Sequence, residues 1–274
     1  MATMPDASRL GVRRRTAVTL CLLVAVLVPA VPAQAHHRPP AQPAQPAQPA
    51  PLPRLNDLLT GLLAALFPPS GGGVAPTVSQ RVAASTVRIA GPDCNGVRVG
   101  SGFAAGSDLV ATAAHVVAGV TGPEVVRPDG RRLPATVVAF DADKDLAVLR
   151  VSGLGQSPLP LGRAVNGSQG AVFGHPGGQP QVEISPATIV ATGTVRLENL
   201  YGDLSSREIL RLNARLAPGD SGGAVVDGTG TVVGVAFAVA ILRPDVAYAV
   251  TAQELQPVLA SVSGSAVGTG PCLS

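Results

Sequence analysis

The 274-residue chain has no tryptophan, only two tyrosines and five phenylalanines, and charged residues make up 14% of it. Long hydrophobic runs are also scarce: only residues 16–31 approach the length of a membrane span, and glycine, proline or charge interrupts everything that follows. A protein with several membrane-spanning helices is therefore excluded. Residues 1–35 carry four of the 20 basic residues and one of the 17 acidic residues, so residues 36–274 hold 16 of each. This neutral balance excludes a basic surface for nucleic acid.

The first 35 residues have the three parts of a secretory signal peptide. Three arginines at 13–15 precede an apolar run from Ala17 to Val31, and Ala33-Gln34-Ala35 provides a small-x-small cleavage sequence. The apolar run is shorter than the ~20 residues that cross a bilayer, so cleavage after Ala35 is favoured over an uncleaved anchor. We expect a secreted or cell-envelope protein that contacts a membrane only if the leader is retained.

Two linkers separate this leader from the main domain. Residues 36–53 are rich in Pro, Ala and Gln and predict an extended spacer. In residues 54–78, leucines at helical spacing predict a short amphipathic helix, followed by a Gly-rich joint. This helix either packs on the domain or contacts a partner or membrane surface. The main domain is expected at 79–274.

Cysteine is as scarce as the aromatic residues, with three in the chain. Cys21 lies within the leader, so cleavage leaves Cys94 and Cys272. In an oxidising compartment an even pair of cysteines indicates one disulfide, and the alternative is two free, buried thiols.

From Thr86 onward, short β-rich segments alternate with Gly, Pro, Asp and Asn, which predicts an all-β sandwich or pair of barrels. Six strands are predicted at 86–90, 98–104, 109–111, 124–127, 135–140 and 146–151. Six more follow a Gly- and Pro-rich break, at 170–174, 184–196, 209–213, 223–226, 232–238 and 246–250. One helix is predicted near the C-terminus, where Thr251 and Glu254 have the spacing of a capping box.

Two segments of the first half offer an acid–base pair. His115 follows a predicted strand in the sequence ATAAHVV, and histidine is the usual general base at neutral pH, although a lone histidine is more often structural. Asp145 precedes the apolar strand LAVL, where a buried carboxylate could accept a hydrogen bond from His115 Nδ1. Asp141 and Asp143 are expected to stay solvated in the same turn. The alternative for all three carboxylates is an ordinary acidic turn.

The most specific pattern is PGDSGG at residues 218–223. Gly219 permits the backbone twist that points its own N–H and that of Ser221 at one spot, which would form an oxyanion hole, and Gly222 and Gly223 keep bulk away from the serine. The alternative, a glycine-rich turn that happens to contain serine, is disfavoured by the histidine and aspartate motifs that precede it in matching order.

The order His, Asp, Ser across two six-stranded halves, with TAAHVV, DLAVL and GDSGG, resembles the chymotrypsin-fold, trypsin-like serine proteases, in particular their exported bacterial branch. A GSGF strand before the histidine, a Pro-Gly-Gly turn at 176–178 and a closing VGTGPC segment at 267–272 add to the likeness, which covers about residues 79–274. The resemblance implies two six-stranded antiparallel barrels of the chymotrypsin type with a short C-terminal helix. It also implies a disulfide between Cys94 and Cys272.

The same resemblance assigns roles to residues. It implies that His115 is the general base, Asp145 the orienting acid and Ser221 the nucleophile of an endopeptidase, with the amides of Gly219 and Ser221 as the oxyanion hole. His175, in the Pro-Gly-Gly turn, is expected to be structural. The chemistry needs no metal and no organic cofactor. Protein or peptide substrates are the expected partners, nucleic acid is not expected, and the protein is expected to be a monomer.

Substrate preference is indicated by two further segments. Arg215 stands six residues before Ser221, where trypsin-like enzymes place an acid, so a preference for Lys or Arg is not expected. Ala236, Phe237 and Ala238 should form the pocket wall, which predicts small or medium apolar residues immediately before the scissile bond (the P1 residue). Two other functions stay open: a catalytically silent exported binding or scaffold domain of the same fold, and an esterase.

Overall fold

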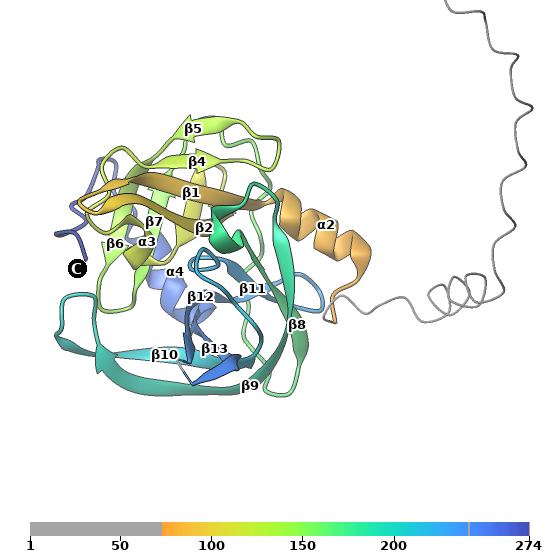
Figure 1. Cartoon of the computed structure of the whole chain (residues 1–274). Coiled ribbons are helices and arrows are strands. Elements are labelled where there is room, and N and C mark those ends of the chain that lie inside the picture. Colours follow the sequence, from red (N-terminus) through yellow and green to blue (C-terminus); the bar gives the residue numbers. More distant parts are fainter. Residues whose placement is uncertain (1–72, 241, 274) are drawn as a thin grey trace, which may run out of the picture. The chain divides into compact units, whose positions relative to one another are not determined.

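The computed structural model describes residues 73–240 and 242–273, which form two curled antiparallel β-sheets with short helices around them (Figure 1). The first sheet has the order β5-β4-β1-β2-β3-β7-β6, and the second closes into a barrel in the order β10-β13-β12-β11-β8-β9. The strands of the first sheet are β1 Thr86–Asp93, β2 Gly96–Gly106, β3 Leu109–Thr112, β4 Glu124–Val126, β5 Arg132–Pro134, β6 Thr136–Asp141 and β7 Leu146–Arg150. Those of the second are β8 Gln169–Gly174, β9 Glu183–Glu198, β10 Leu204–Asn213, β11 Ala224–Asp227, β12 Val232–Ala240 and β13 Arg243–Thr251. The predicted all-β fold is confirmed.

All twelve predicted strands are present, and the structure adds β5. This three-residue strand lies at the edge of the first sheet and pairs only with β4. At an edge, the missing N–H of Pro134 is tolerated, whereas in an inner strand it would remove a hydrogen bond to a neighbouring strand. A segment of three residues is too short to display the alternation that marks a strand in sequence. The first sheet therefore has seven strands rather than the six expected.

The largest core cluster joins the two sheets. It contains Phe103 from β2, Val148 from β7, Phe173 from β8 and Val235 from β12, all of them fully buried. Leu255 of α4 (Ala252–Ala260) completes it, and Figure 1 shows α4 lying between the sheets. Because this cluster fixes one sheet against the other, it also fixes the loops that leave their strands.

The helix α2 (Pro76–Ala84) was not predicted. Pro76 occupies its first turn, where the missing N–H breaks no intrahelical hydrogen bond, and Val82 is fully buried in the core. Val74, just before α2, is 5% exposed and belongs to the same core cluster. The expected domain boundary at Ser79 thus falls inside a packed helix. The predicted signal peptide, the 36–53 spacer and the Leu-rich segment up to residue 72 lie outside the described residues.

The capping box predicted for α4 is wrong. Thr251 is the N-cap residue, but its side chain caps nothing, and its buried Oγ1 has no hydrogen-bond partner among the described residues. The Glu254 carboxylate is used elsewhere: it accepts the backbone N–H of Glu208 at 2.8 Å and pairs with Lys144 at 3.1 Å. Tertiary contacts therefore override the local capping signal. None of the helices in the described ranges is long and apolar enough to cross a bilayer.

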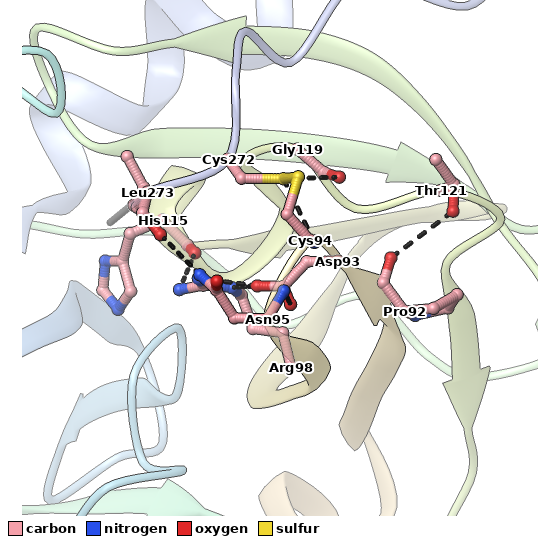
Figure 2. Close-up of polar contacts among 10 residues, drawn as sticks. All are labelled: Pro92, Asp93, Cys94, Asn95, Arg98, His115, Gly119, Thr121, Cys272 and Leu273. Carbon is pink, nitrogen blue, oxygen red and sulfur yellow. Dashed lines mark hydrogen bonds and ion pairs between the residues drawn. A yellow bond between two sulfur atoms is a disulfide. The ribbon is translucent and has the colours of Figure 1, made fainter.

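Cys94 and Cys272 are joined by a disulfide, with their Cα atoms 6.0 Å apart (Figure 2). Cys94 lies in the turn between β1 and β2, and Cys272 Sγ lies 3.7 Å from the carbonyl oxygen of Gly119. Gly119 fits so closely that a Cβ there would lie 2.6 Å from Cys272 Cα. Since Gly119 follows α3 (Ala114–Val117), which carries His115, the disulfide ties the C-terminal segment to the loop behind that histidine.

Replacing both cysteines by serine should lower the melting temperature by several degrees. The bond closes a loop of 178 residues, and loss of such a bond typically removes about 2–4 kcal/mol of stability. A smaller effect is expected on the position of His115, because Cys272 packs against the loop after α3. Differential scanning calorimetry and a free-thiol count on the native protein test this. An unchanged melting temperature, or two titratable thiols, would contradict it.

Candidate active site

His115 is held at two points by one carboxylate. Its ring nitrogen Nδ1 lies 2.8 Å from Asp145 Oδ2, and its backbone N–H donates to Asp145 Oδ1 at 2.9 Å. The Asp145 side chain is 4% exposed and that of His115 is 23% exposed. A buried carboxylate that accepts from Nδ1 keeps the proton on that nitrogen and leaves Nε2 free to accept a proton from another group.

The turn before β7 separates Asp145 from its two neighbouring carboxylates. Asp145 has a φ of 56°, a left-handed conformation that turns its side chain away from the course of the strand. Asp141 accepts the backbone N–H of Lys144 at 2.9 Å, and Asp143, which is exposed, accepts the Asn199 amide at 2.7 Å. Of the three carboxylates in this turn, Asp145 is the one that contacts His115.

Ser221 lies in the turn between β10 and β11, against the segment that carries His115. Gly222 has a φ of 85°, and a Cβ there would overlap Ser101 O and Thr112 Oγ1 and approach the backbone nitrogen of Ala113 to 3.0 Å. Ala113 is two positions before His115, so the tight turn needs glycine at 222. No hydrogen bond joins Ser221 Oγ to the imidazole within the described ranges. Such bonds often tighten only when substrate is bound.

Two amides of the serine loop are left free. Its other N–H groups are used: Asp220 donates to Ala217 O at 3.0 Å, Gly222 to Ala236 O at 2.7 Å and Gly223 to Asp220 O at 2.9 Å. The N–H groups of Gly219 and Ser221 donate to no acceptor in residues 73–240 and 242–273. Gly219 has a φ of 104° and packs against the carbonyl of His175. Two unpaired amides in one loop are the kind of donor that an oxyanion requires.

Ser101 connects these parts and was not singled out from the sequence. Its Oγ donates to Gly219 O at 2.7 Å and accepts the N–H of His175 at 2.8 Å, and its backbone N–H donates to Ser221 O at 2.8 Å. Its carbonyl accepts Thr112 Oγ1 at 2.6 Å. Ser101 is the second residue of the GSGF motif and is fully buried, and no spacing rule distinguishes such a residue from an ordinary strand serine.

Ser101→Ala should lower kcat for peptide cleavage by about ten- to hundredfold with little change in KM. The variant loses the hydroxyl that holds the Gly219 peptide, and small displacements of positioned groups produce losses of that size. Ser107→Ala, at an exposed serine of the next turn, is the matched control and should leave both constants unchanged. A change confined to KM, or equal effects of the two substitutions, would contradict the positioning role.

A cavity of about 270 Å³ opens beside Ser221. Its lining residues are Leu216, Ala217, Pro218, Asp220, Ser221, Ala236, Phe237, Ala238 and Val239. The predicted wall residues Ala236, Phe237 and Ala238 are among them. No basic side chain lines this cavity, and its one acidic residue is Asp220.

Arg215 does not line this cavity. It lines a separate one of about 660 Å³, together with Glu183 and Asp245. Leu216, the next residue, does line the cavity beside Ser221, so counting six residues back from Ser221 does not by itself place a side chain in that pocket. The larger cavity contains neither His115 nor Ser221.

His175 lies beside the serine loop without facing the reacting groups. Its Nδ1 lies 3.0 Å from Gln179 O, and because a carbonyl can only accept, the ring proton is on Nδ1. Burial lowers the pKa of the imidazole, and Nε2 has no partner among the described residues. Burial therefore favours the neutral imidazole, and the residue supports the backbone near Gly219 and Ser101.

Asp220 is a buried carboxyl group with no basic partner. It is 4% exposed, and its Oδ2 accepts the N–H of Ala217 at 2.8 Å. Burial raises the pKa of Asp220 to about 6, the Ala217 N–H opposes this rise, and the nearby Glu183 carboxylate adds to it.

The raised pKa of Asp220 predicts a pH-dependent contribution to stability. The folded state holds this proton more tightly than the unfolded state does. The contribution of Asp220 to stability is therefore largest below the unfolded pKa of 3.8 and is lost as the pH rises through about 6. Asp220→Asn keeps an oxygen acceptor for Ala217 N–H and removes the ionisation. The melting temperature of the variant relative to that of the native protein should therefore rise by a few degrees between pH 4 and pH 7. A constant difference across that range would show that Asp220 does not titrate this way.

A family model for the trypsin-like peptidase domain matches residues 100–235. The crystal structure of the Rv3671c protease of Mycobacterium tuberculosis in its active form superposes with a TM-score of 0.70 and 31% identity, covering 85% of this chain and all of that one. This chain belongs to the trypsin-like serine proteases. The predicted chymotrypsin-type architecture is thereby confirmed, and His115, Asp145 and Ser221 all lie within the matched residues 100–235.

Other trypsin-like proteases extend the likeness. The full serine protease Rv3671c of M. tuberculosis is 35% identical over 241 residues, which is 81% of this chain and 60% of that protein. Protease Do-like 1 of Arabidopsis thaliana chloroplasts is 30% identical over 136 residues, 47% of this chain and 30% of that protein. The HtrA-type protease AlgW, solved with a tripeptide, is 26% identical, with a TM-score of 0.61 over 70% of this chain and 63% of its own. This chain thus spans less than two thirds of these relatives' full lengths.

Proposed function

We propose that the chain is an exported serine endopeptidase that hydrolyses peptide bonds through an acyl-enzyme. In this proposal Ser221 is the nucleophile and His115 is the general base. Asp145 orients the imidazole and stabilises its protonated form. The amides of Gly219 and Ser221 form the oxyanion hole. Export is supported by the signal-peptide pattern of residues 1–35 and by the disulfide, a bond typical of proteins outside the cytoplasm.

The observation that carries the proposal is the two-point hold of Asp145 on His115. An aspartate in an ordinary acidic turn faces solvent, as Asp143 does, whereas Asp145 is buried and gives one oxygen to the ring and the other to the backbone of the same residue. A structural role alone would not require an imidazole in this arrangement. The arrangement selects the tautomer in which Nε2 can take a proton from a serine.

The chemistry follows from these positions. Ser221 Oγ attacks the substrate carbonyl as its proton passes to His115 Nε2, and the carbonyl oxygen, now negative, accepts from the two free amides. The imidazolium, stabilised by Asp145, then protonates the leaving amine. Water then attacks the acyl carbonyl as it gives a proton to His115, and His115 passes that proton to Ser221 Oγ as the bond between Oγ and the acyl group breaks. These steps use no metal and no cofactor.

The cavity beside Ser221 supports an apolar P1 residue. Its wall of Ala236, Phe237 and Ala238 offers carbon surface, and its volume of about 270 Å³ suits a small or medium side chain. Asp220, the one acidic residue of the lining, is oriented toward the N–H of Ala217.

Cleavage of an unstructured protein tests the proposal against its two rivals. The native protein should cut casein at internal bonds, and mass spectrometry of the new termini should find small or medium apolar residues before the cuts. Matched amide and ester substrates with the same acyl group are measured in parallel. Ester turnover without any peptide cleavage would favour the esterase, and turnover of neither would favour a silent binding domain.

A further inference from the structure

Arg207, on β10, is a buried cation without an anion. The residue is 6% exposed, and its Nε and Nη1 atoms are enclosed and have no hydrogen-bond partner among the described residues. No carboxylate in those ranges lies within ion-pair distance of it. Burying a charge without a partner is unfavourable by several kcal/mol, so such a residue calls for an explanation beyond packing.

Two charged side chains near this part of β10, Lys144 and Glu254, pair with each other rather than with Arg207. Lys144 pairs with Glu254 at 3.1 Å and also donates to Ser206 O at 2.6 Å. Glu254 accepts the backbone N–H of Glu208, and Asp143 accepts the Asn199 amide. The strand on both sides of Arg207 is therefore held in place, while the guanidinium itself is left unpaired.

The guanidinium lies next to the cavity that contains Ser221. Its Cζ is 4.7 Å from the centre of the Phe237 ring, and Phe237 is part of the cavity wall. Phe237 is the extra residue of a bulge in the β12–β13 pairing, a device that redirects a side chain next to a site. The Lys144–Ser206 bond places β10 against the turn that ends at Asp145. The Phe237 ring thus lies between Arg207 and the pocket, and Arg207 is on the side of the turn that ends at Asp145.

We propose that Arg207 is a specificity-determining residue that receives the carboxylate of a substrate Asp or Glu side chain. The substrate residue would lie two to four positions before the scissile bond, since the P1 side chain occupies the cavity on which Phe237 borders. A guanidinium pairs with a carboxylate through two parallel N–H donors, and a partly buried pair is weakly screened by salt. The substrate carboxylate would pair with the Arg207 guanidinium, which has no carboxylate partner among the described residues. This inference rests on the proposed peptidase function.

Paired peptides test the inference. Each pair has the same apolar P1 residue and differs only in Glu or Gln at the second, third or fourth position before the cut. For the native protein, kcat/KM should be about tenfold higher for the Glu peptide at one of these positions. In Arg207→Met, which keeps an unbranched side chain but removes the guanidinium, the ratio should fall to about one. Arg211→Met, at an exposed arginine on the same strand, is the matched control and should keep the native ratio.

The outcomes separate the two proposals. Equal rates for every pair in the native protein, or a Glu preference that survives Arg207→Met, would overturn the role of Arg207 while leaving the peptidase intact. If Arg207→Met does not fold, Arg207→Lys keeps the charge without the two-pronged donor and should give an intermediate ratio; a native ratio there would overturn the inference. If no peptide is cleaved, the proposed function fails, and calorimetric binding of the same pairs to Ser221→Ala then decides on Arg207 alone. Equal affinity for Glu and Gln peptides would overturn it.

Discussion

Ser221→Ala should lower kcat for peptide cleavage by about 10⁴–10⁶ while the fold stays intact. The substitution removes one oxygen from a turn whose shape is fixed by other groups: Ser101 N–H holds the carbonyl of residue 221, and Gly222 N–H bonds to Ala236 O. Within residues 73–240 and 242–273, no hydrogen bond of the loop depends on the hydroxyl, so the melting temperature should change little. Steady-state cleavage of a fluorogenic peptide and a thermal melt measure the two quantities.

The matched control for this substitution is Ser107→Ala, at an exposed serine outside the site. It should leave both the rate and the melting temperature unchanged. If Ser221→Ala still cleaves near the native rate, another residue is the nucleophile. If it loses both activity and fold, the hydroxyl has a structural part that the hydrogen bonds do not explain.

Asp145→Asn should lower kcat by about 10⁴. Asp145 accepts from two donors of the same residue, the ring Nδ1 and the backbone N–H of His115. An asparagine can accept at only one of its two positions and presents an NH₂ group at the other. With its oxygen on the backbone N–H, the NH₂ faces Nδ1 and forces the proton to Nε2, which can then no longer act as base. Asparagine tolerates the φ of 56°, so the turn should persist.

Asp141→Asn and Asp143→Asn serve as controls in the same turn. Their carboxylates accept from Lys144 N–H and from the Asn199 amide, and neither contacts His115. Both variants should retain activity within a few-fold of the native rate. A larger loss at either position than at Asp145 would reassign the orienting acid.

The positions of the strands could be predicted because short β-rich segments, such as Leu146 to Val151, are separated by turn-forming residues. Both features are local properties of the sequence. β5 and α2 were not predicted. β5 is too short to show a period, and α2 depends on Val82 reaching a core formed by distant strands. The capping box at Thr251 failed for the same reason, since Glu254 bonds to Lys144 and Glu208.

The three motif residues of the candidate site were visible in sequence because glycines and an ordered set of His, Asp and Ser mark them. The residues that hold and flank the site were not. Ser101 bonds to Gly219 and Ser221, more than a hundred residues away, and Arg207 meets Phe237 only because β10 and β12 join the same barrel. Such contacts follow from topology, which single-residue patterns do not encode.

The central claim is that Ser221 is a nucleophile activated by His115. A fluorophosphonate probe reacts with such serines, and peptide mapping by mass spectrometry identifies the modified residue. We expect one phosphonylated site, Ser221, in the native protein, and labelling reduced by at least about a thousandfold in rate in His115→Ala, whose serine has lost its base. Labelling at a different serine, no labelling at all, or an equal rate in the His115 variant would contradict the account.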